Sequence, residues 1–167
     1  NQRRNRLYLN QGDFRFEDVT AAAGVGGEKA WSTGVSVADV NGDGRLDLYV
    51  CNSGDIAGDN KQNELFINQG NDEDGVPIFN GDGTFSEQAE AYGLADRGFS
   101  THAAFFDYDK DGDLDCYLLN NSYRAIGSFN LKDNERPIRD SVGGDKLFRN
   151  EGDRFVDVSR AAHIYGS

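Results

Sequence analysis

The sequence is poor in positive charge and in long apolar runs. Against 29 Asp and Glu residues stand 17 Lys and Arg, so the formal net charge is −12. This deficit of positive charge argues against a nucleic acid or an anionic membrane surface as the partner. No apolar run approaches the roughly 20 residues that a membrane helix needs, so membrane insertion is not expected.

Proline is also scarce, with 2 residues, whereas glycine is abundant, with 21. Short apolar bursts separated by glycine predict many short strands joined by tight turns. The 167 residues are enough for one modest domain with a core of its own. No signal peptide is visible and the first residue is Asn1. We therefore expect the sequence to be a processed or excised piece.

Cysteine and histidine are rare, with two residues of each. Cys51 and Cys116 occupy non-equivalent places in the repeats described below. We expect both to be small apolar strand residues, with a disulfide as the alternative. The spacing of these cysteines from His102 and His163 does not support a zinc site.

The chain repeats itself. Residues 31–52 align without gaps on residues 99–120, at an offset of 68 residues. A second unit, with an apolar pair, Asn, a Gly-containing turn and Phe, occurs at 7–25, 65–94 and 147–164. Internal repeats of this kind are typical of solenoids and propellers.

Each full repeat predicts a strand, an acidic loop, a strand, a link, a strand, a turn and a strand. Four antiparallel strands in about 60 residues have the size of a propeller blade. The fold class is therefore all-β, with about two and a half blades in a partial or assembled β-propeller. We expect the C-terminal half of a preceding blade at 1–30, a blade at 31–94, and a blade at 95–167 that contains a long insertion, 121–146.

An acidic loop occurs twice, at 39–50 and 107–118, and places oxygen-bearing side chains at alternate positions with a glycine sixth. Calcium takes six to eight oxygen ligands, mostly from protein, so the pattern predicts two Ca²⁺ sites rather than magnesium sites. The expected side-chain ligands are Asp39, Asn41, Asp43, Asp47, Asp107, Asp109, Asp111 and Asp115, with the backbone carbonyls of Arg45 and Asp113.

Two alternatives to this interpretation are disfavoured. An acidic turn without a cation would suffer repulsion among carboxylates that are close in sequence. An EF-hand needs a glutamate at position 12 and flanking helices, whereas Val50 and Leu118 stand there and lead into strands. Leu46 and Leu114, at position 8, are expected to anchor each loop in the core.

The acidic loops, followed by Leu-Phe-x-Asn-x-Gly, resemble the FG-GAP/VCBS repeats of integrin α-chain-type β-propellers. Residues 63–94 and 105–121 are similar to the subgroup that includes cartilage acidic protein and ASPIC/UnbV-type proteins. The resemblance implies a secreted or cell-surface protein whose calcium loops, with the ligands given above, stiffen the blades in adhesive or matrix roles. The chain departs from this pattern in blade number, because propellers typically close with about 4–8 blades.

Open blades predict partners that cover their edges and faces. These are other blades of a longer chain or further copies in a ring or filament, and an extracellular protein or glycan is a further partner. The predicted function is a calcium-binding extracellular segment with a structural, adhesive or self-assembling role. The alternative is a calcium-stabilised carbohydrate- or protein-binding module acting through the long insertion. Its candidate contact residues are Tyr123, Arg124, Phe129 and Arg136.

An enzyme is not expected. The sequence contains no serine elbow, phosphate loop or zinc signature, and the clustered carboxylates are assigned to metal. His102 aligns with Gly34 and is expected to be a surface or strand residue. Asn120 begins a glycosylation sequon with Asn121 and Ser122.

Overall fold

The structure, a computed structural model, describes residues 4–27, 31–54, 61–70, 84–122, 140 and 142–164. Within these residues the chain forms short strands and one helical turn. In chain order they are β1 (Tyr8–Asn10), β2 (Phe16–Asp18), α1 (Thr20–Ala23), β3 (Ser32–Ala38), β4 (Asp47–Asn52), β5 (Glu64–Asn68), β6 (Phe85–Glu87), β7 (Ser100–Phe106), β8 (Asp115–Asn120), β9 (Lys146–Asn150) and β10 (Phe155–Asp157).

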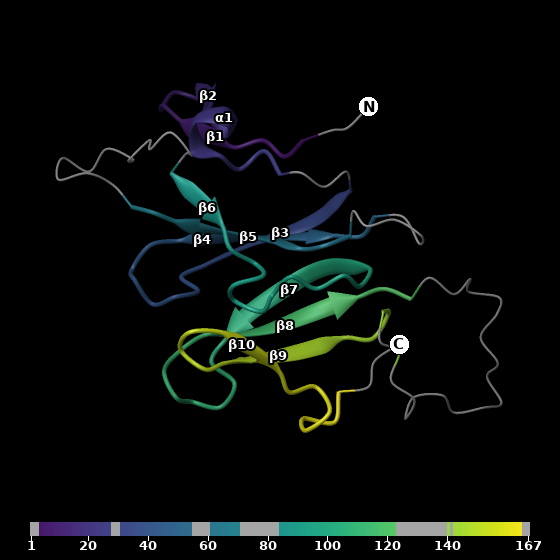
Figure 1. The fold of residues 1–167 in the computed structure, drawn as a ribbon. Helices are drawn as coiled ribbons and strands as arrows, with labels where there is room; N and C mark the ends of the chain where they lie inside the picture. The colour runs from purple at the N-terminus through teal and green to yellow at the C-terminus, as the bar shows by residue number, and fades with distance from the viewer. Residues whose placement is uncertain are drawn as a thin grey trace.

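The strands form three antiparallel sheets. β1 and β2 make a two-stranded sheet, while the orders β3-β4-β5-β6 and β10-β9-β8-β7 make two sheets of four strands. The sheets are stacked, with β3–β6 in the middle layer (Figure 1). The predicted all-β class of antiparallel, propeller-like blades is confirmed.

The Asn-x-Gly turns close the hairpins as their sequence predicts. The side chains of Asn10, Asn68 and Asn150 each accept a hydrogen bond from the N–H of the glycine two residues later, at 2.8, 3.0 and 3.0 Å. These glycines have φ values of 82°, 98° and 88°, a region that side chains with a Cβ resist. The local chemistry of these turns therefore sets the direction in which the chain leaves β1, β5 and β9.

A tight turn follows the last strand of each unit, and in the N-terminal unit this turn is α1. α1 is followed by Gly24, whose φ of 73° is left-handed. The turns after β6 and β10 are closed in the same way, by the N–H of Tyr92 on the carbonyl of Gln88 and by equivalent groups near the C-terminus. Among the described residues, no helix is long and apolar enough to cross a membrane.

The larger core lies between the two four-stranded sheets. Tyr49 and Leu65 from the middle sheet meet Leu118 and Phe155 from the other, and all four are almost fully buried. The rings of Tyr49 and Phe105 meet edge to face with centroids 5.7 Å apart. Burial of each such side chain contributes about 1.5–3 kcal/mol, so this interface is the main source of stability among the described residues.

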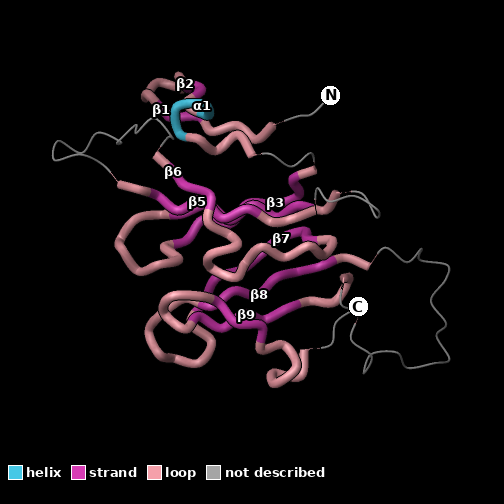
Figure 2. The backbone as a smooth tube through the Cα atoms, in the orientation of Figure 1, coloured by secondary structure: helices cyan, strands magenta, loops and turns pink. Residues whose placement is uncertain are grey.

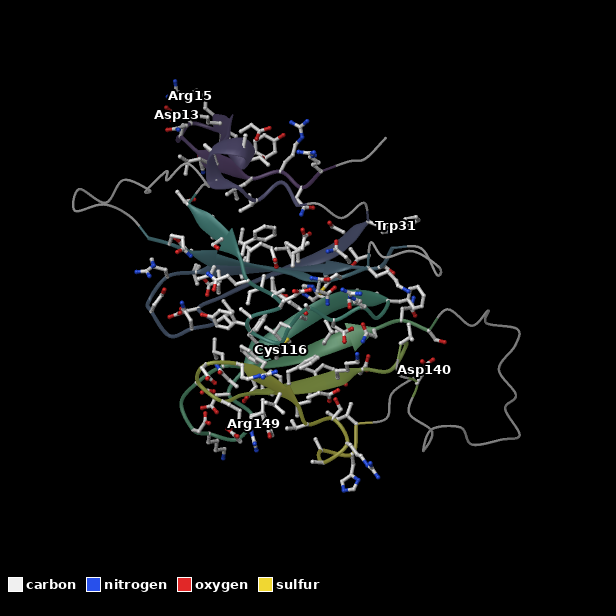
Figure 3. All side chains as sticks on the ribbon, viewed as in Figure 1. Asp13, Arg15, Trp31, Cys116, Asp140 and Arg149 are labelled. Atoms are coloured by element: carbon white, nitrogen blue, oxygen red, sulfur yellow. The ribbon has the colours of Figure 1, made fainter. Side chains whose placement is uncertain are left out.

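Both cysteines lie in this larger core and both thiols are free. Figure 3 shows Cys116 between the sheets. Burial raises the pKa of the Cys51 thiol to about 12, and burial also raises the pKa of Cys116. Thiols that stay protonated at neutral pH are inert. The predicted role as small apolar residues is confirmed and the disulfide alternative is wrong.

Polar contacts fix how the two large sheets face each other. Thr33 Oγ1 donates a hydrogen bond to the carbonyl of Ser100 across the interface, at 2.6 Å. The side-chain amide of Asn63 donates to both Tyr49 Oη and Ser100 Oγ, at 2.9 Å each. Since Asn63, Tyr49 and Ser100 are buried, their pairing makes the mutual position of the sheets specific.

A smaller core lies between the middle sheet and the N-terminal unit. Ala23 is the last residue of α1, and Val25 follows the helix. Both pack against Val50 and Phe66 of the middle sheet. A two-stranded sheet buries fewer side chains than a four-stranded one, so the core against the N-terminal unit is smaller than the core between the four-stranded sheets. The middle sheet is thus covered unequally on its two faces.

The long insertion falls largely outside the described residues. β9 begins at Lys146, the last residue of the expected insertion 121–146. The proposed contact residues of the insertion lie outside the described residues. They are Tyr123, Arg124, Phe129 and Arg136.

Candidate metal centres

The two acidic loops connect β3 to β4 and β7 to β8. They lie on the same side of the stacked sheets, one in each layer, and are coloured blue and green in Figure 1. Gly44 and Gly112, the sixth residues, have φ values of 85° and 102°, and no atom lies within 4 Å of a Cβ added at either. Glycine is therefore required by the backbone curl rather than by lack of space. Position 4 also has positive φ in both loops, 71° at Gly42 and 68° at Lys110.

The first loop folds its acceptors inward onto its own backbone. The carboxylate of Asp39 accepts the N–H of Asp43 at 3.0 Å and that of Gly44 at 2.8 Å. The side-chain oxygen of Asn41 also accepts the N–H of Asp43, at 3.2 Å. The structure thus brings together the predicted ligands at positions 1, 3 and 5.

An arginine side chain compensates charge in the first loop. The guanidinium of Arg45 donates to Asp43 Oδ2 at 2.6 Å and to the carbonyl of Asn68 at 3.2 Å. The sequence pattern predicts only a backbone carbonyl role for Arg45. Its side chain lowers the negative charge available to a cation in this loop.

The second loop gathers carboxylates more tightly. Asp107 accepts the N–H of Lys110 at 2.6 Å and that of Gly112 at 3.2 Å. One ligand atom from each of Asp107, Asp109 and Asp115 lies within 4.8 Å of the others, close enough to share one ion. Oxygen ligands at this spacing suit a hard divalent cation.

Electrostatics in the second loop favour a positive charge there. Burial, with repulsion from Asp111, raises the pKa of Asp109, and the same causes raise the pKa of Asp113 to about 6. Oδ1 of Asp113 is buried and has no hydrogen-bond partner among the described residues. A bound cation would reverse the direction of these pKa shifts because it favours the ionised carboxylates. The residues of this loop therefore fit calcium.

The guanidinium of Arg149 lies beside this loop but is hydrogen-bonded to a glutamate. Arg149 faces a shallow pocket beside Asp109, Asp111 and Asp113 (Figure 3). Its Nε donates to Glu151 at 2.8 Å, and this hydrogen bond raises the pKa of the guanidinium. Arg149 thus does not repeat the part that Arg45 takes in the first loop.

The aspartate at position 9 has a second role that sequence reasoning missed. Asp47 is fully buried and accepts the backbone N–H groups of Val40 at 2.9 Å and Asn68 at 2.8 Å. Asp115 accepts the two equivalent N–H groups in the second loop, both at 2.9 Å. Each of these carboxylates therefore fastens its acidic loop to the third strand of its blade.

The asparagine of each Asn-x-Gly turn completes this fastening. The side-chain amide of Asn68 donates to the carbonyl of Leu46 at 3.2 Å, and that of Asn150 donates to the carbonyl of Leu114 at 3.3 Å. Sequence reasoning saw only the turn role of these residues. The signal was present, because the asparagine recurs at the same place in every copy, Asn10 included.

The two leucines at position 8 behave differently. Leu114 packs against the larger core, as predicted. Leu46 is 59% exposed, so the prediction that it anchors its loop is wrong. The difference lies in the surroundings, because Leu114 packs against the core between the two four-stranded sheets, whereas Leu46 belongs to neither core of the described residues.

Two further predicted sites lie on strands. His102 is exposed on β7, as expected for a surface strand residue. The side chain of Asn120, the sequon asparagine, donates to the carbonyl of Gly144 at 3.0 Å and accepts from Ser100 Oγ at 2.8 Å. Attachment of a glycan at this amide would have to break the first of these hydrogen bonds.

The sheets and loops together define a repeat protein of propeller-like blades, each complete blade with an acidic loop between its first two strands. The family model of the FG-GAP-like repeat matches residues 1–50, which span the N-terminal unit and the first acidic loop. This repeat type is a structural or binding module rather than an enzyme family. No curated protein matches the chain.

Proposed function

We propose that the chain is a calcium-binding repeat segment in which each acidic loop binds one Ca²⁺ and thereby stiffens its blade. The observation that carries the proposal is the approach of Asp107, Asp109 and Asp115 to within 4.8 Å, in a loop where carboxylate pKa values are raised. The predicted ligand set of both loops, including the carbonyls of Arg45 and Asp113, remains part of this proposal.

The two sites are expected to differ in affinity. The second loop has an aspartate at each odd position from 107 to 115, whereas the first has Asn41 at position 3 and Arg45 paired with Asp43. Affinity at hard-cation sites rises with ligand charge. Calcium therefore binds the second loop more tightly and fills it first.

An extracellular or cell-surface location follows from this chemistry. Extracellular calcium sites have dissociation constants of about 10⁻⁴–10⁻³ M. At about 1 mM calcium, a site with a dissociation constant of about 0.1 mM adds about 1.4 kcal/mol to stability by mass action. Such a site would be empty at cytosolic calcium levels, so the stiffening operates outside the cell.

The role of the stiffened segment is structural or adhesive, as in the integrin-like and ASPIC/UnbV-type subgroup that the sequence resembles. No catalytic step is assigned to it. Its partners are further blades or further copies of the chain, with an extracellular protein or glycan as a further partner. Apolar side chains are exposed at both ends of the stack, among them Val37 and Phe106. This exposure supports the proposal that partners cover both ends.

Calorimetric titration of chelator-treated protein tests the proposal. We expect two calcium ions per chain, and loss of one in each of the variants Asp39→Ala and Asp109→Ala. The matched control is Asp13→Ala, because Asp13 lies in the exposed β1–β2 turn region and belongs to neither loop. Absence of binding heat, together with an unchanged thermal midpoint at about 1 mM calcium, would contradict the proposal.

A further inference from the structure

The N-terminal unit presents a strand with one free edge. In the complete blades the strand that carries the Asn-x-Gly turn has two neighbours, since β5 lies between β4 and β6 and β9 lies between β8 and β10. β1 pairs only with β2 among the described residues. The equivalence is close, because Asn10 pairs with Phe16 as Asn68 pairs with Phe85. β1 and β2 thus correspond to the outer two strands of a blade.

The backbone N–H of Asn10 points toward this free edge. The N–H of Gln11 is bonded to the carbonyl of Arg15 in β1–β2, so the preceding N–H, that of Asn10, faces away from β2. The equivalent N–H groups of Asn68 and Asn150 donate to position-9 aspartates of acidic loops. No such carboxylate stands opposite Asn10 in the described part of the chain. The geometry indicates an acceptor supplied from elsewhere.

Aligned residues of the two acidic-loop hairpins differ in exposure at this end of the stack. Trp31 is 64% exposed whereas its counterpart Phe99 is 7% exposed, and Val35 is 53% exposed whereas Ala103 is 2% exposed. Figure 3 shows Trp31 projecting away from the sheets. Ala103 belongs to the core between the two four-stranded sheets, and the ammonium of Lys61, which lies ahead of β5, is 4.7 Å from the centre of the Phe99 ring. The cover that Trp31 and Val35 lack therefore corresponds to the inner part of a blade.

A mainly apolar cavity of about 380 Å³ occupies the place of these inner strands. Its lining includes Leu7, Val25, Val35, Val37 and Phe66. At the corresponding place in the next interface the side chains of β4 fill the space, since its residues Tyr49 and Cys51 belong to the larger core there. The volume therefore matches apolar side chains of a strand in the position of β4.

We infer that this surface receives a strand–acidic loop–strand hairpin, of the kind formed by residues 32–52, from a further repeat outside these 167 residues. The hairpin pairs with β1, inserts apolar side chains into the cavity, and offers a position-9 carboxylate to Asn10. A second copy of the chain does not fit this role, because both of its hairpins are already paired with their own third strands, β5 and β9. The inference rests on the proposed function only for the calcium that the added loop would carry.

A fusion tests the inference on the full chain. A copy of residues 31–58 carrying W31F is joined directly ahead of Asn1, which reproduces the natural spacing between an acidic-loop hairpin and its third strand. Trp31 of the original chain is then the only tryptophan in the fusion, so its fluorescence reports whether the added hairpin covers it. We expect a shift of its emission to shorter wavelength, a several-fold fall in acrylamide quenching, and three calcium ions per chain instead of two.

A matched control carries Y49D and C51D in the added copy, which places two charges in the apolar cavity. Trp31 in this control should be quenched as in the unfused chain. The inference is overturned if quenching of Trp31 is equal in the fusion and the unfused chain. It is also overturned if the unfused chain is a dimer in which Trp31 is already protected. Failure of the native loops to bind calcium would remove the proposed function, while Trp31 protection would still decide this inference.

Discussion

At the residue scale, the aspartates of each loop divide into two kinds. Asp115 is buried and accepts two backbone N–H groups, so it contributes to stability with or without an ion. Asp109 is an exposed residue, yet partial desolvation of its carboxylate and repulsion from Asp111 raise its pKa, so its charge is unfavourable in the ion-free loop. Two aspartates of one motif therefore have different energetic roles.

This division predicts opposite behaviour of two amide variants in chelator. Asp115→Asn places an NH₂ group where two N–H donors need acceptors, and should lower the free energy of unfolding by about 1–3 kcal/mol. Asp109→Asn relieves repulsion and should leave that free energy unchanged or slightly higher, while weakening calcium binding. Urea unfolding with and without calcium measures both effects. Equal destabilisation of the two variants in chelator would contradict the division.

At the element scale, the decisive contact is the approach of β3 to β7. The two strands belong to different sheets and lie side by side in the stack (Figure 2). At Gly34 an added Cβ would lie 2.4 Å from the carbonyl oxygen of Thr101. The absence of a side chain at Gly34 therefore allows the two backbones to come this close. His102 is the other residue of β7 that a Cβ at this position would meet.

Gly34→Ala should force these strands apart and lower stability by about 1–3 kcal/mol, as overpacking of an interface does. Gly26→Ala is the control, because a Cβ there would meet its nearest atom at an ordinary 3.7 Å. It should change stability by less than about 0.5 kcal/mol. Thermal unfolding in calcium compares the two, and similar midpoints would show that the close approach is absent in solution.

At the scale of the whole molecule, the stack has two unequal ends. The N-terminal end carries the cavity and the exposed Trp31, while the outer face of the β7–β10 sheet exposes Phe106 and Leu119. Exposed apolar residues on a blade face mark a surface for association. The two ends therefore differ in the apolar surface that they expose.

Neighbouring residues on β8 provide a test of which face is outward. Leu119→Lys changes a side chain that is 40% exposed, so it should alter stability by less than about 0.5 kcal/mol and reduce the binding of a hydrophobic dye. Leu118→Lys would bury an unpaired charge in the larger core, where Leu118 is 0% exposed, and should prevent folding. A folded Leu118→Lys protein, or an unfolded Leu119→Lys protein, would reverse the assignment of faces.

Much of the fold could be predicted from local pattern. Alternating apolar residues, the Asn-x-Gly turns and the repeat offset led to antiparallel blades, because strand pairing and turn chemistry depend on nearby residues. The curled loops followed in the same way from Gly44 and Gly112. The recurrence of the turn asparagine marked Asn68 as important but not its contact with the loop. That contact and the pairing of Arg45 with Asp43 depend on side-chain directions that are set by folding.

The sequence alone determined the order of strands and loops, the oxygen-bearing side chains of each acidic loop, and the direction of each turn. These properties depend on backbone preference and on oxygen atoms within a few positions of each other. Only the tertiary structure decided which of two matching residues is covered. Leu46 and Leu114 have the same local motif, yet one is exposed and the other packed, because burial depends on the layer that lies against each blade.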